Sequence, residues 1–453
     1  MPLRHTFMPF WSFQLFSFSI LPQQSQGNID QKLRFNLIVW RNLKSHKRVR
    51  KAKNLKRTIM SNQEQKQQSV VKPSRAWSRI KAAQGAVPVL SDKPWVSLPK
   101  DMYAHTPVYI PIISEKGCQT EWWWHIGTLK SVDGKRTFGF EINACALYNP
   151  GAAFTEVMLT DVEKQIHYHE SKSTIGVPLG WAETDQSKPW RVTLENVAMN
   201  GPQGDPTQDM TVQATLNQGP TKVEFDLTMT QDGAPLYVFG DGAALHPGQA
   251  EPNLSENNYY FSLTRISTSG TIKIYSGEVL EPEIIEVAGE TWMDHEWGNF
   301  TDKSSSGKTQ SVQWILQDMQ LENGITLSNF TLSPPTLDVP MKSMATVQLK
   351  PGGESHYVET SMTVVKEVPF TVATPTKTDP NKTQNRKYYT EIVVSVPEFG
   401  IEAFVKSSMP KQLFAGGIYE GVGTVTAVVN AVDGSAAPAK EVKGTAWVEQ
   451  NIF

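Results

Sequence analysis

Short runs of alternating apolar and polar residues, separated by strong turn signals, make up the chain from about residue 100 onward. The segments SVDGKR (131–136), LENGIT (321–326) and AVDGSA (431–436) each contain an Asp-Gly or Asn-Gly pair. Two-residue hairpins favour these pairs because both central residues adopt positive φ. Long helical periodicity is scarce. This pattern predicts an antiparallel all-β barrel or sandwich.

Matched landmarks in the same order divide this region into two related halves. In each half a tryptophan, Trp124 or Trp314, stands ten residues before the glycine of the first turn. The closing segments also match, with YSG…EVAGETW in 275–292 and YEG…EVKGTAW in 419–447. Shared openings and closings in one order indicate a duplicated module rather than chance similarity.

We therefore predict two consecutive lipocalin-like antiparallel β-barrel domains, over residues 96–298 and 299–453. Residues 1–95 are expected to be a disordered N-terminal extension outside the fold. The apolar segment 7–21 lacks a clean signal-peptide cleavage site, and Met60 offers a second start for translation. No apolar run reaches the ~18 residues of a membrane-spanning helix.

Charge is unevenly distributed along the chain. Residues 1–60 hold 12 Lys+Arg and one acid, Asp30, which leaves 31 basic and 44 acidic residues in 61–453 and a net charge of −13. An acidic body disfavours nucleic acid and anionic membranes as partners. The expected compartment is the cytoplasm if translation starts at Met60, and the exterior if residues 1–25 act as a signal peptide.

The stretch TEWWWHIG (120–127) is the first dense group of aromatic and titratable residues. If Asp133 and Gly134 form a two-residue turn, the numbers of paired residues sum to 267, and side chains alternate between the two faces. The expected inward, apolar face carries Glu121, Trp123 and His125, and the opposite face carries Trp122 and Trp124 beside Cys145 and Asn143. This register does not pair the two cysteines, Cys118 and Cys145, so no disulfide is expected.

The stretch WMDHEWG (292–298) is the second dense group. Alternation places Trp292, Asp294 and Glu296 on one face and Met293, His295 and Trp297 on the other. A carboxyl group among tryptophan rings is poorly solvated, which raises its pKa and lets it donate a proton at neutral pH. Indole faces also stabilise developing positive charge, by about 0.5–2 kcal/mol each.

The two halves differ after the closing tryptophan. The first continues with Asp294, His295 and Glu296, whereas the second continues with Glu-Gln-Asn-Ile (449–452). Because folding alone would favour the same residues in both copies, this difference supports a specialised role in the first half. The alternative is structural, since tryptophan clusters in β-barrels dominate the core and buried Asp or His often ties loops together.

Other motifs are weak. His167 and His169 in IHYHE share a strand face without a complete set of metal ligands, so no metal site is predicted. The Gly-x-Ser-x-Gly elbow, phosphate-binding loops and dinucleotide fingerprints are absent from the sequence. No cofactor is therefore expected.

Several of these motifs together resemble those of the AttH-like, carotenoid 1,2-hydratase-type lipocalin-like family. They are TEWWWHIGTL, GETWMDHEWG, VQWILQDMQLENGITL and YEGVGTV…VKGTAWVE, and the resemblance spans about residues 100–453. The family includes carotenoid hydratases, kievitone hydratase and, more distantly, fungal Diels–Alder cyclases. The resemblance implies two lipocalin-like barrels that hold a hydrophobic polyene, prenyl or terpenoid-like ligand.

Three functions follow as hypotheses. The first is a cofactor-free hydratase, a carbon–oxygen lyase, in which Asp294 donates a proton and His295 acts as base or orienting partner. The others are a carrier of a lipophilic ligand without chemistry, and a Diels–Alder-type cyclase. The predicted catalytic residues are Asp294, His295 and Glu296, and the predicted substrate-binding residues are Glu121, Trp122, Trp123, Trp124, His125, Trp292, Trp297, Trp314 and Tyr419. The ligand's identity and the oligomeric state stay open.

Overall fold

The structure is a computed structural model that describes most of the chain from residue 94 onward. The described ranges are 94–105, 117–148, 151–246, 249–277, 281–299, 314–331, 337–374, 379, 381–414, 417–430 and 439–452. Residues 1–93, and with them nearly all of the predicted N-terminal extension, lie outside this set. Within the described residues, no helix has the length and apolar character needed to cross a membrane.

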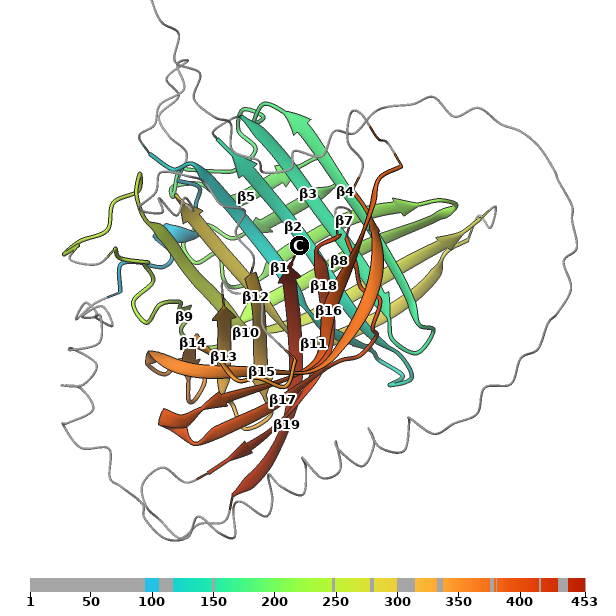
Figure 1. The fold of residues 1–453 in the computed structure, drawn as a ribbon. Helices are drawn as coiled ribbons and strands as arrows, with labels where there is room; N and C mark the ends of the chain where they lie inside the picture. Colours follow the sequence, from blue (N-terminus) through green and yellow to red (C-terminus); the bar gives the residue numbers. More distant parts are fainter. Residues whose placement is uncertain are drawn as a thin grey trace, which may run out of the picture. The chain divides into compact units, whose positions relative to one another are not determined.

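The described part of the chain is almost entirely β-structure, which confirms the predicted fold class (Figure 1). The first module contains a short 3₁₀ helix and one large antiparallel sheet. Its elements are η1 (Lys100–Met102), β1 (Thr120–Ser131), β2 (Thr137–Leu147), β3 (Ala152–Asp161), β4 (Ile166–Ile175), β5 (Trp190–Leu194), β6 (Val197–Gly201), β7 (Met210–Gln218), β8 (Thr221–Gln231), β9 (Leu236–Tyr237), β10 (Asn258–Ser276) and β11 (Glu283–Gly298).

The sheet of the first module runs in the order β4-β3-β2-β1-β11-β10-β8-β7-β6-β5, and β9 pairs with β10. No backbone ladder joins its two ends among the described strands. Side chains bridge β4 to β7 instead: the backbone N–H of His169 donates to Gln218 at 2.8 Å, and that of Asn217 donates to Glu170 at 2.9 Å. The first module is thus a rolled, barrel-like sheet that side chains help to close.

The second module is a closed antiparallel barrel in which β12 pairs with β19. A 3₁₀ turn interrupts the path between two of its strands. Its elements are β12 (Trp314–Leu321), β13 (Thr326–Thr331), β14 (Met341–Gln348), β15 (Ser355–Ala373), β16 (Thr383–Val396), η2 (Pro397–Phe399), β17 (Ile401–Ser407), β18 (Tyr419–Val429) and β19 (Lys440–Asn451).

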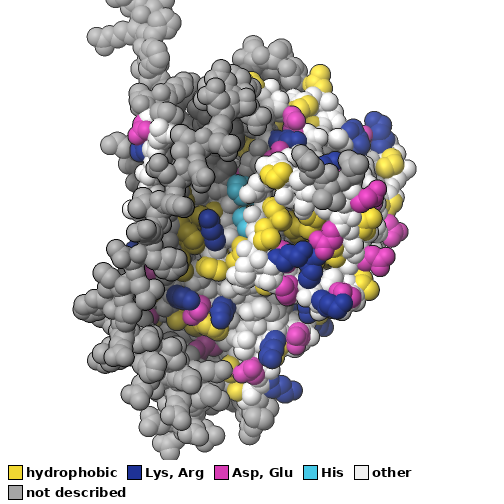
Figure 2. Space-filling view, turned by 90° about the vertical axis from the view of Figure 1, so that its right-hand side faces the viewer, with side chains coloured by type: hydrophobic (Ala, Val, Ile, Leu, Met, Phe, Trp, Pro, Cys, Tyr) yellow, Lys and Arg dark blue, Asp and Glu magenta, His cyan; other side chains and the backbone are white. Residues whose placement is uncertain are grey.

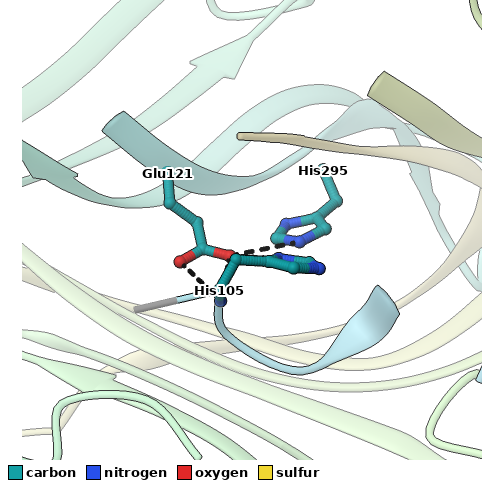
Figure 3. A group of neighbouring side chains, drawn as sticks. All are labelled: His105, Glu121 and His295. Atoms are coloured by element: carbon teal, nitrogen blue, oxygen red, sulfur yellow. Dashed lines mark hydrogen bonds and ion pairs between the residues drawn. The ribbon is translucent and has the colours of Figure 1, made fainter. Parts of the chain in front are cut away.

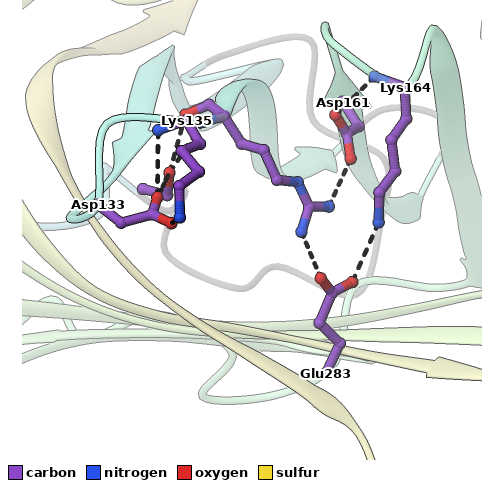
Figure 4. Close-up of polar contacts among 7 residues, drawn as sticks. Asp133, Lys135, Asp161, Lys164 and Glu283 are labelled. Atoms are coloured by element: carbon purple, nitrogen blue, oxygen red, sulfur yellow. Dashed lines mark hydrogen bonds and ion pairs between the residues drawn. The ribbon is translucent and has the colours of Figure 1, made fainter.

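The β1–β2 hairpin has the register that the sequence predicts. Glu121 pairs with Ala146 and Trp122 with Cys145, so each pair of numbers sums to 267. Figure 4 shows the ion pairs at the turn end of this hairpin. Arg136 bonds Asp161 and Glu283, so one guanidinium ties the hairpin to β3 and to the start of β11.

Each module has its own apolar core, and a third apolar cluster joins the two modules. A strand whose two faces are both covered can hold buried groups on both sides, which is the situation of β1 and β11. The cluster consists of Ile126, Met158, Leu236 and Trp292 from the first module and Phe414, Val422 and Trp447 from the second.

Polar side chains also link the modules. The Gln320 side chain of β12 donates to the backbone carbonyls of Thr264 at 2.7 Å and Thr291 at 3.0 Å. In the other direction, the buried Arg265 guanidinium of β10 donates to the carbonyl of Ile325 at 2.8 Å. These bonds satisfy backbone groups that the module contact removes from water.

The face shown in Figure 2 carries charges of both signs, interspersed with apolar side chains. On this face the described basic residues form no extended patch.

Candidate functional site

The two aromatic–acid stretches lie side by side at the centre of the first sheet. Strands β1 and β11 are antiparallel neighbours, so Trp124 stands opposite Asp294, and Trp123 opposite His295. Strand alternation then sends successive side chains to opposite faces of the sheet. The candidate site therefore has two parts, one inside the first module and one between the modules.

The predicted catalytic residues are divided between these two faces. His295 faces the interior of the first module, where its ring stacks with Trp123 at a centroid distance of 4.3 Å and with Trp297 at 4.8 Å. Asp294 faces the second module together with Trp292, which belongs to the apolar cluster between the modules. His295 therefore has no direct path to a proton on Asp294.

Asp294 is buried among hydrogen-bond donors. The Ser262 hydroxyl and the Trp292 indole N–H each donate to its Oδ1 at 2.6 Å. Burial raises the pKa of Asp294 to about 6, although hydrogen bonds from Ser262, Trp292 and Tyr260 oppose the shift. The environment that the sequence predicted for this carboxyl is present.

The second module brings further carboxyl groups to Asp294. Burial raises the pKa of Asp318 on β12 well above its ordinary value, and the charge of Asp294 raises it further. Burial also raises the pKa of Glu449 on β19 to about 7, against a hydrogen bond from Trp314. Glu296 is partly buried, with a raised pKa caused by desolvation and then by the charges of Asp294 and Glu449. We call Asp294, Glu296, Asp318 and Glu449 the interface carboxyl group.

Three more acids are buried at the same module contact. Glu141 and Glu156 come from β2 and β3, and Glu420 comes from β18. Desolvation is the largest cause of the raised pKa of each of them, which is about 7 for Glu156. The Trp447 indole N–H donates to Glu420 at 2.8 Å, as Trp292 does to Asp294. Tryptophan–carboxyl pairs thus occur on both sides of the contact.

A small cavity of about 10 Å³ lies beside the interface carboxyl group. It is large enough for about one water molecule. Asp318 is 3 % exposed, and a hydrogen bond from Ser328 partly opposes the rise of its pKa. The cavity is lined by Ile126, Gly127, Thr128, Trp292, Asp318, Gln320, Thr445, Ala446 and Trp447.

The interior face holds a compact cluster of His105, Glu121 and His295 (Figure 3). His105 Nδ1 lies 2.8 Å from Glu121 Oε1, and His295 Nε2 lies 3.6 Å from the same oxygen. Although burial opposes it, hydrogen bonds to Asp101 and Glu121 raise the pKa of His105 to about 9. Burial holds the pKa of His295 well below its ordinary value. These three side chains are the group of metal-ligand types that could hold an ion within the described residues.

The remaining predicted residues are spread over both modules. Trp122 and Trp124 lie on the same face of β1, with their rings 6.3 Å apart. His125 is fully buried, and its desolvation lowers its pKa to about 3. Tyr419 lies in the core of the second module, where its hydroxyl donates to the Met409 carbonyl. Both cysteines are buried and unpaired.

The sequence did not single out several residues that the fold brings to these sites. His105 and Asp101 stand in a segment without strand or motif pattern. Asp318 and Glu420 are isolated acids in apolar strands, a signal that would have marked them as buried carboxyls. The sequence placed Glu449 only in the segment of the second half that corresponds to Asp294, His295 and Glu296.

The fold and the site define a two-module all-β protein with carboxyl groups buried where the modules meet. The chain belongs to the AttH-like family, whose model matches residues 90–451. This confirms the resemblance that the sequence motifs indicated. None of the curated proteins matches the chain significantly.

Solved structures share the fold at low sequence identity. The chain is similar to an AttH-type protein of Nitrosomonas europaea, with 19 % identity, a TM-score of 0.55, and coverage of 80 % of this chain and 98 % of that one. It is also similar to kievitone hydratase of Nectria haematococca, with 14 % identity, a TM-score of 0.51, and coverage of 80 % and 95 %.

Proposed function

We propose that this protein is a hydratase-type enzyme that adds water to an alkene in a hydrophobic polyene, prenyl or terpenoid-like small molecule. The observation that carries the proposal is the set of carboxyl groups from both modules, buried against tryptophans at one contact. A solved structure that aligns with 80 % of this chain and 95 % of its own chain is named a hydratase. Membership of the AttH-like family agrees with this class of function.

The proposed chemistry needs one acid and one base. Asp294 protonates the alkene, and the electron-rich faces of Trp292 and Trp124 stabilise the resulting carbocation. Water adds to the cation, and the carboxylate that Asp294 becomes after the first step takes the proton that the water loses. This returns Asp294 to its starting state. The sum is alkene plus water giving an alcohol.

His295 has a supporting role in this scheme. Its Nδ1–H donates to the Trp122 carbonyl at 2.9 Å, which fixes β11 against β1 directly beside Asp294. Glu296 lies on the same face of β11 as Asp294, and the charge of Asp294 helps to raise the pKa of Glu296. In this scheme the base role that the sequence suggested for His295 passes to the Asp294 carboxylate.

Substrate access requires the module contact to open. The cavity at Asp318 accommodates water and is far smaller than the ~300–1,000 Å³ of a ligand pocket. The substrate therefore has to displace apolar side chains of the contact. We expect binding to be accompanied by quenching of tryptophan fluorescence, since Trp292 and Trp447 lie there.

Substitution of Asp294 by Asn tests the proposal. The purified protein is incubated with a lipid extract, and retained or altered molecules are identified by mass spectrometry. A product heavier by one water is expected, and Asp294→Asn should lower its formation by about 10²–10⁴-fold with unchanged circular dichroism. Asp226→Asn, at an exposed position of β8, is the matched control.

Each other result excludes the proposal in a distinct way. Full turnover by Asp294→Asn would remove Asp294 from the chemistry. A ligand retained without a change of mass or structure would identify a carrier. An isomer of unchanged mass would identify a cyclase.

A further inference from the structure

The interior face of β1 and β11 carries titratable side chains that take no part in the proton transfers of the proposed hydration. His105, Glu121 and His295 come from three separate segments, and their nearest ligand-type atoms all lie within 4.8 Å of one another. Glu121 and His295 are fully buried, and His105 is partly buried at the end of the segment that follows η1. Such convergence of nitrogen and oxygen donors in an apolar core requires a physical reason.

The orientation of His295 leaves one nitrogen without a partner. Its Nδ1 lies 2.9 Å from the Trp122 carbonyl, an acceptor, so Nδ1 carries the proton. Nε2 then presents a lone pair toward Glu121, and it has no hydrogen-bonding partner among the described residues. A carboxylate cannot donate to this lone pair. A buried lone pair facing a carboxylate is stabilised by a cation placed between them.

The surrounding groups hold the other two side chains in place. Asp101 Oδ1 lies 3.2 Å from His105 Nε2, and the Tyr148 hydroxyl donates to Glu121 Oε2 at 2.8 Å. The His105 ring stacks on Trp297 at 4.1 Å with an interplanar angle of 1°. Carboxylate partners on the far side of a histidine ring and hydrogen-bonded carboxylate ligands are typical outer contacts of metal sites.

We propose that His105, Glu121 and His295 form a binding site for a divalent transition-metal ion of the Zn²⁺ class. The ligand atoms are His105 Nδ1, Glu121 Oε1 and His295 Nε2, a two-histidine, one-glutamate set that zinc accepts together with a water molecule. Bonds of about 2.0–2.2 Å in tetrahedral geometry place ligand atoms about 3.4 Å apart. The observed separations from Glu121 Oε1 are 2.8 and 3.6 Å, and all three atoms lie within 4.8 Å of one another, so the side chains have to shift by about 1 Å to reach this spacing.

The charges balance on binding. The ion takes the place of the proton on His105 Nδ1, and that proton is released to solvent. The Nε2–H of His105 keeps its hydrogen bond to Asp101. The two carboxylates, Asp101 and Glu121, then offset the charge of the ion. The proposed function does not depend on this site, because Asp294 faces the other side of the sheet.

The ion would anchor residues 94–105 across the interior of the first module. This segment also bonds through the Trp123 indole N–H to the Met102 carbonyl at 3.2 Å and through the Tyr103 hydroxyl to the Lys188 carbonyl at 2.8 Å. An ion bound by His105, by Glu121 of β1 and by His295 of β11 would attach the end of this segment to the sheet.

Calorimetric titration of the chelator-treated full chain with zinc sulfate, and absorption spectroscopy with cobalt chloride, test the proposal. One ion should bind per chain, and Co²⁺ should give the visible bands of a low-coordinate site. His105→Gln and Glu121→Gln should abolish both signals, and Asp101→Asn should weaken binding about 10–100-fold. His356→Gln, at a half-buried histidine of β15 outside the cluster, should bind as the unaltered chain does.

Near-ultraviolet circular dichroism of the tryptophans reports whether each variant keeps its fold. If Glu121→Gln disturbs folding, His105→Gln alone tests the proposal, because His105 lies at the edge of the core. Absence of binding to the unaltered chain would overturn the proposal. Undiminished binding to His105→Gln would overturn it as well, because the ion would then bind elsewhere.

Discussion

Single carboxyl groups at the module contact link the stability of this protein to pH. Glu156 is 8 % exposed, and burial raises its pKa to about 7, with a partly opposing hydrogen bond from Ser171. Its ordinary value is 4.5. Between these values the folded state binds a proton that the unfolded chain releases, so stability falls as pH rises from about 4.5 to about 7.

We predict that Glu156→Gln flattens this dependence. The uncharged amide removes the cost of ionising a buried carboxyl, so the variant should gain up to about 3 kcal/mol relative to the unaltered chain at pH 8 and nothing at pH 4. Urea denaturation across this pH range measures the effect. Glu286→Gln, at an exposed position of β11, should leave the slope unchanged, and equal slopes for both variants would refute the prediction.

The sequence predicted the surroundings of Asp294 more fully than its partners. Alternation along β11 gives the face of each residue, and the neighbouring tryptophans indicate desolvation. Alternation does not reveal which distant strand covers that face. Asp318 and Glu449 therefore could not be assigned to Asp294 before the module contact was known. His105 was missed because it reaches its site from a segment without regular structure.

Among the elements, turn chemistry fixed the β1–β2 hairpin. The Asp-Gly pair sets the loop length, and loop length sets the register, so the pairing of Glu121 with Ala146 could be derived from local sequence. The ends of the first sheet follow no such local rule. Its closure depends on side chains of β4 and β7, such as Glu170, that meet only after the sheet has rolled.

Arg265 of β10, in the first module, forms hydrogen bonds to the end of β12 in the second module. Its guanidinium donates to the carbonyls of Leu321 at 3.1 Å and Ile325 at 2.8 Å, on either side of the β12–β13 turn, and its Nε donates to Thr326 Oγ1 at 3.1 Å. Glu290 bonds the same guanidinium. The sequence marked this turn as a hairpin but gave no sign of the arginine that covers it.

We predict that Arg265→Met destabilises the fold by about 1–3 kcal/mol, because the variant loses several hydrogen bonds to buried groups of the second module and leaves the carbonyls of Leu321 and Ile325 only their backbone donors. Methionine retains the apolar stem, so the loss reports the polar contacts. Chemical denaturation measures the free energy, and hydrogen exchange should accelerate in residues 321–326. Arg191→Met, an exposed arginine that bonds only the Gly180 carbonyl in the described residues, should change stability by less than about 0.5 kcal/mol. Comparable losses for both variants would contradict this account.

For the molecule as a whole, the question is whether the two modules pack against each other tightly enough to act as one unit. Gly139 of β2 provides a probe. A Cβ at this position would lie 2.5 Å from Cγ1 and 2.6 Å from Cβ of Val422 on β18. Valine is short and stiff at χ1, so its side chain cannot move aside without strain. The absence of a side chain at residue 139 therefore allows the modules to make contact.

We predict that Gly139→Ala costs about 1–3 kcal/mol through overpacking. Val422→Ala removes the opposing methyl groups at its own cost of about 0.5–1.5 kcal/mol or more, as for other losses of buried methyls. In the double variant the overlap with Cγ1 is gone and only that with Cβ of residue 422 remains, so its destabilisation should fall short of the sum by about 0.5–3 kcal/mol. Such coupling between residues 283 positions apart in sequence requires that the modules meet at this point in solution. Additivity within about 0.3–0.5 kcal/mol would mean that they do not, and Asp294 would then face solvent rather than the carboxyls of the second barrel.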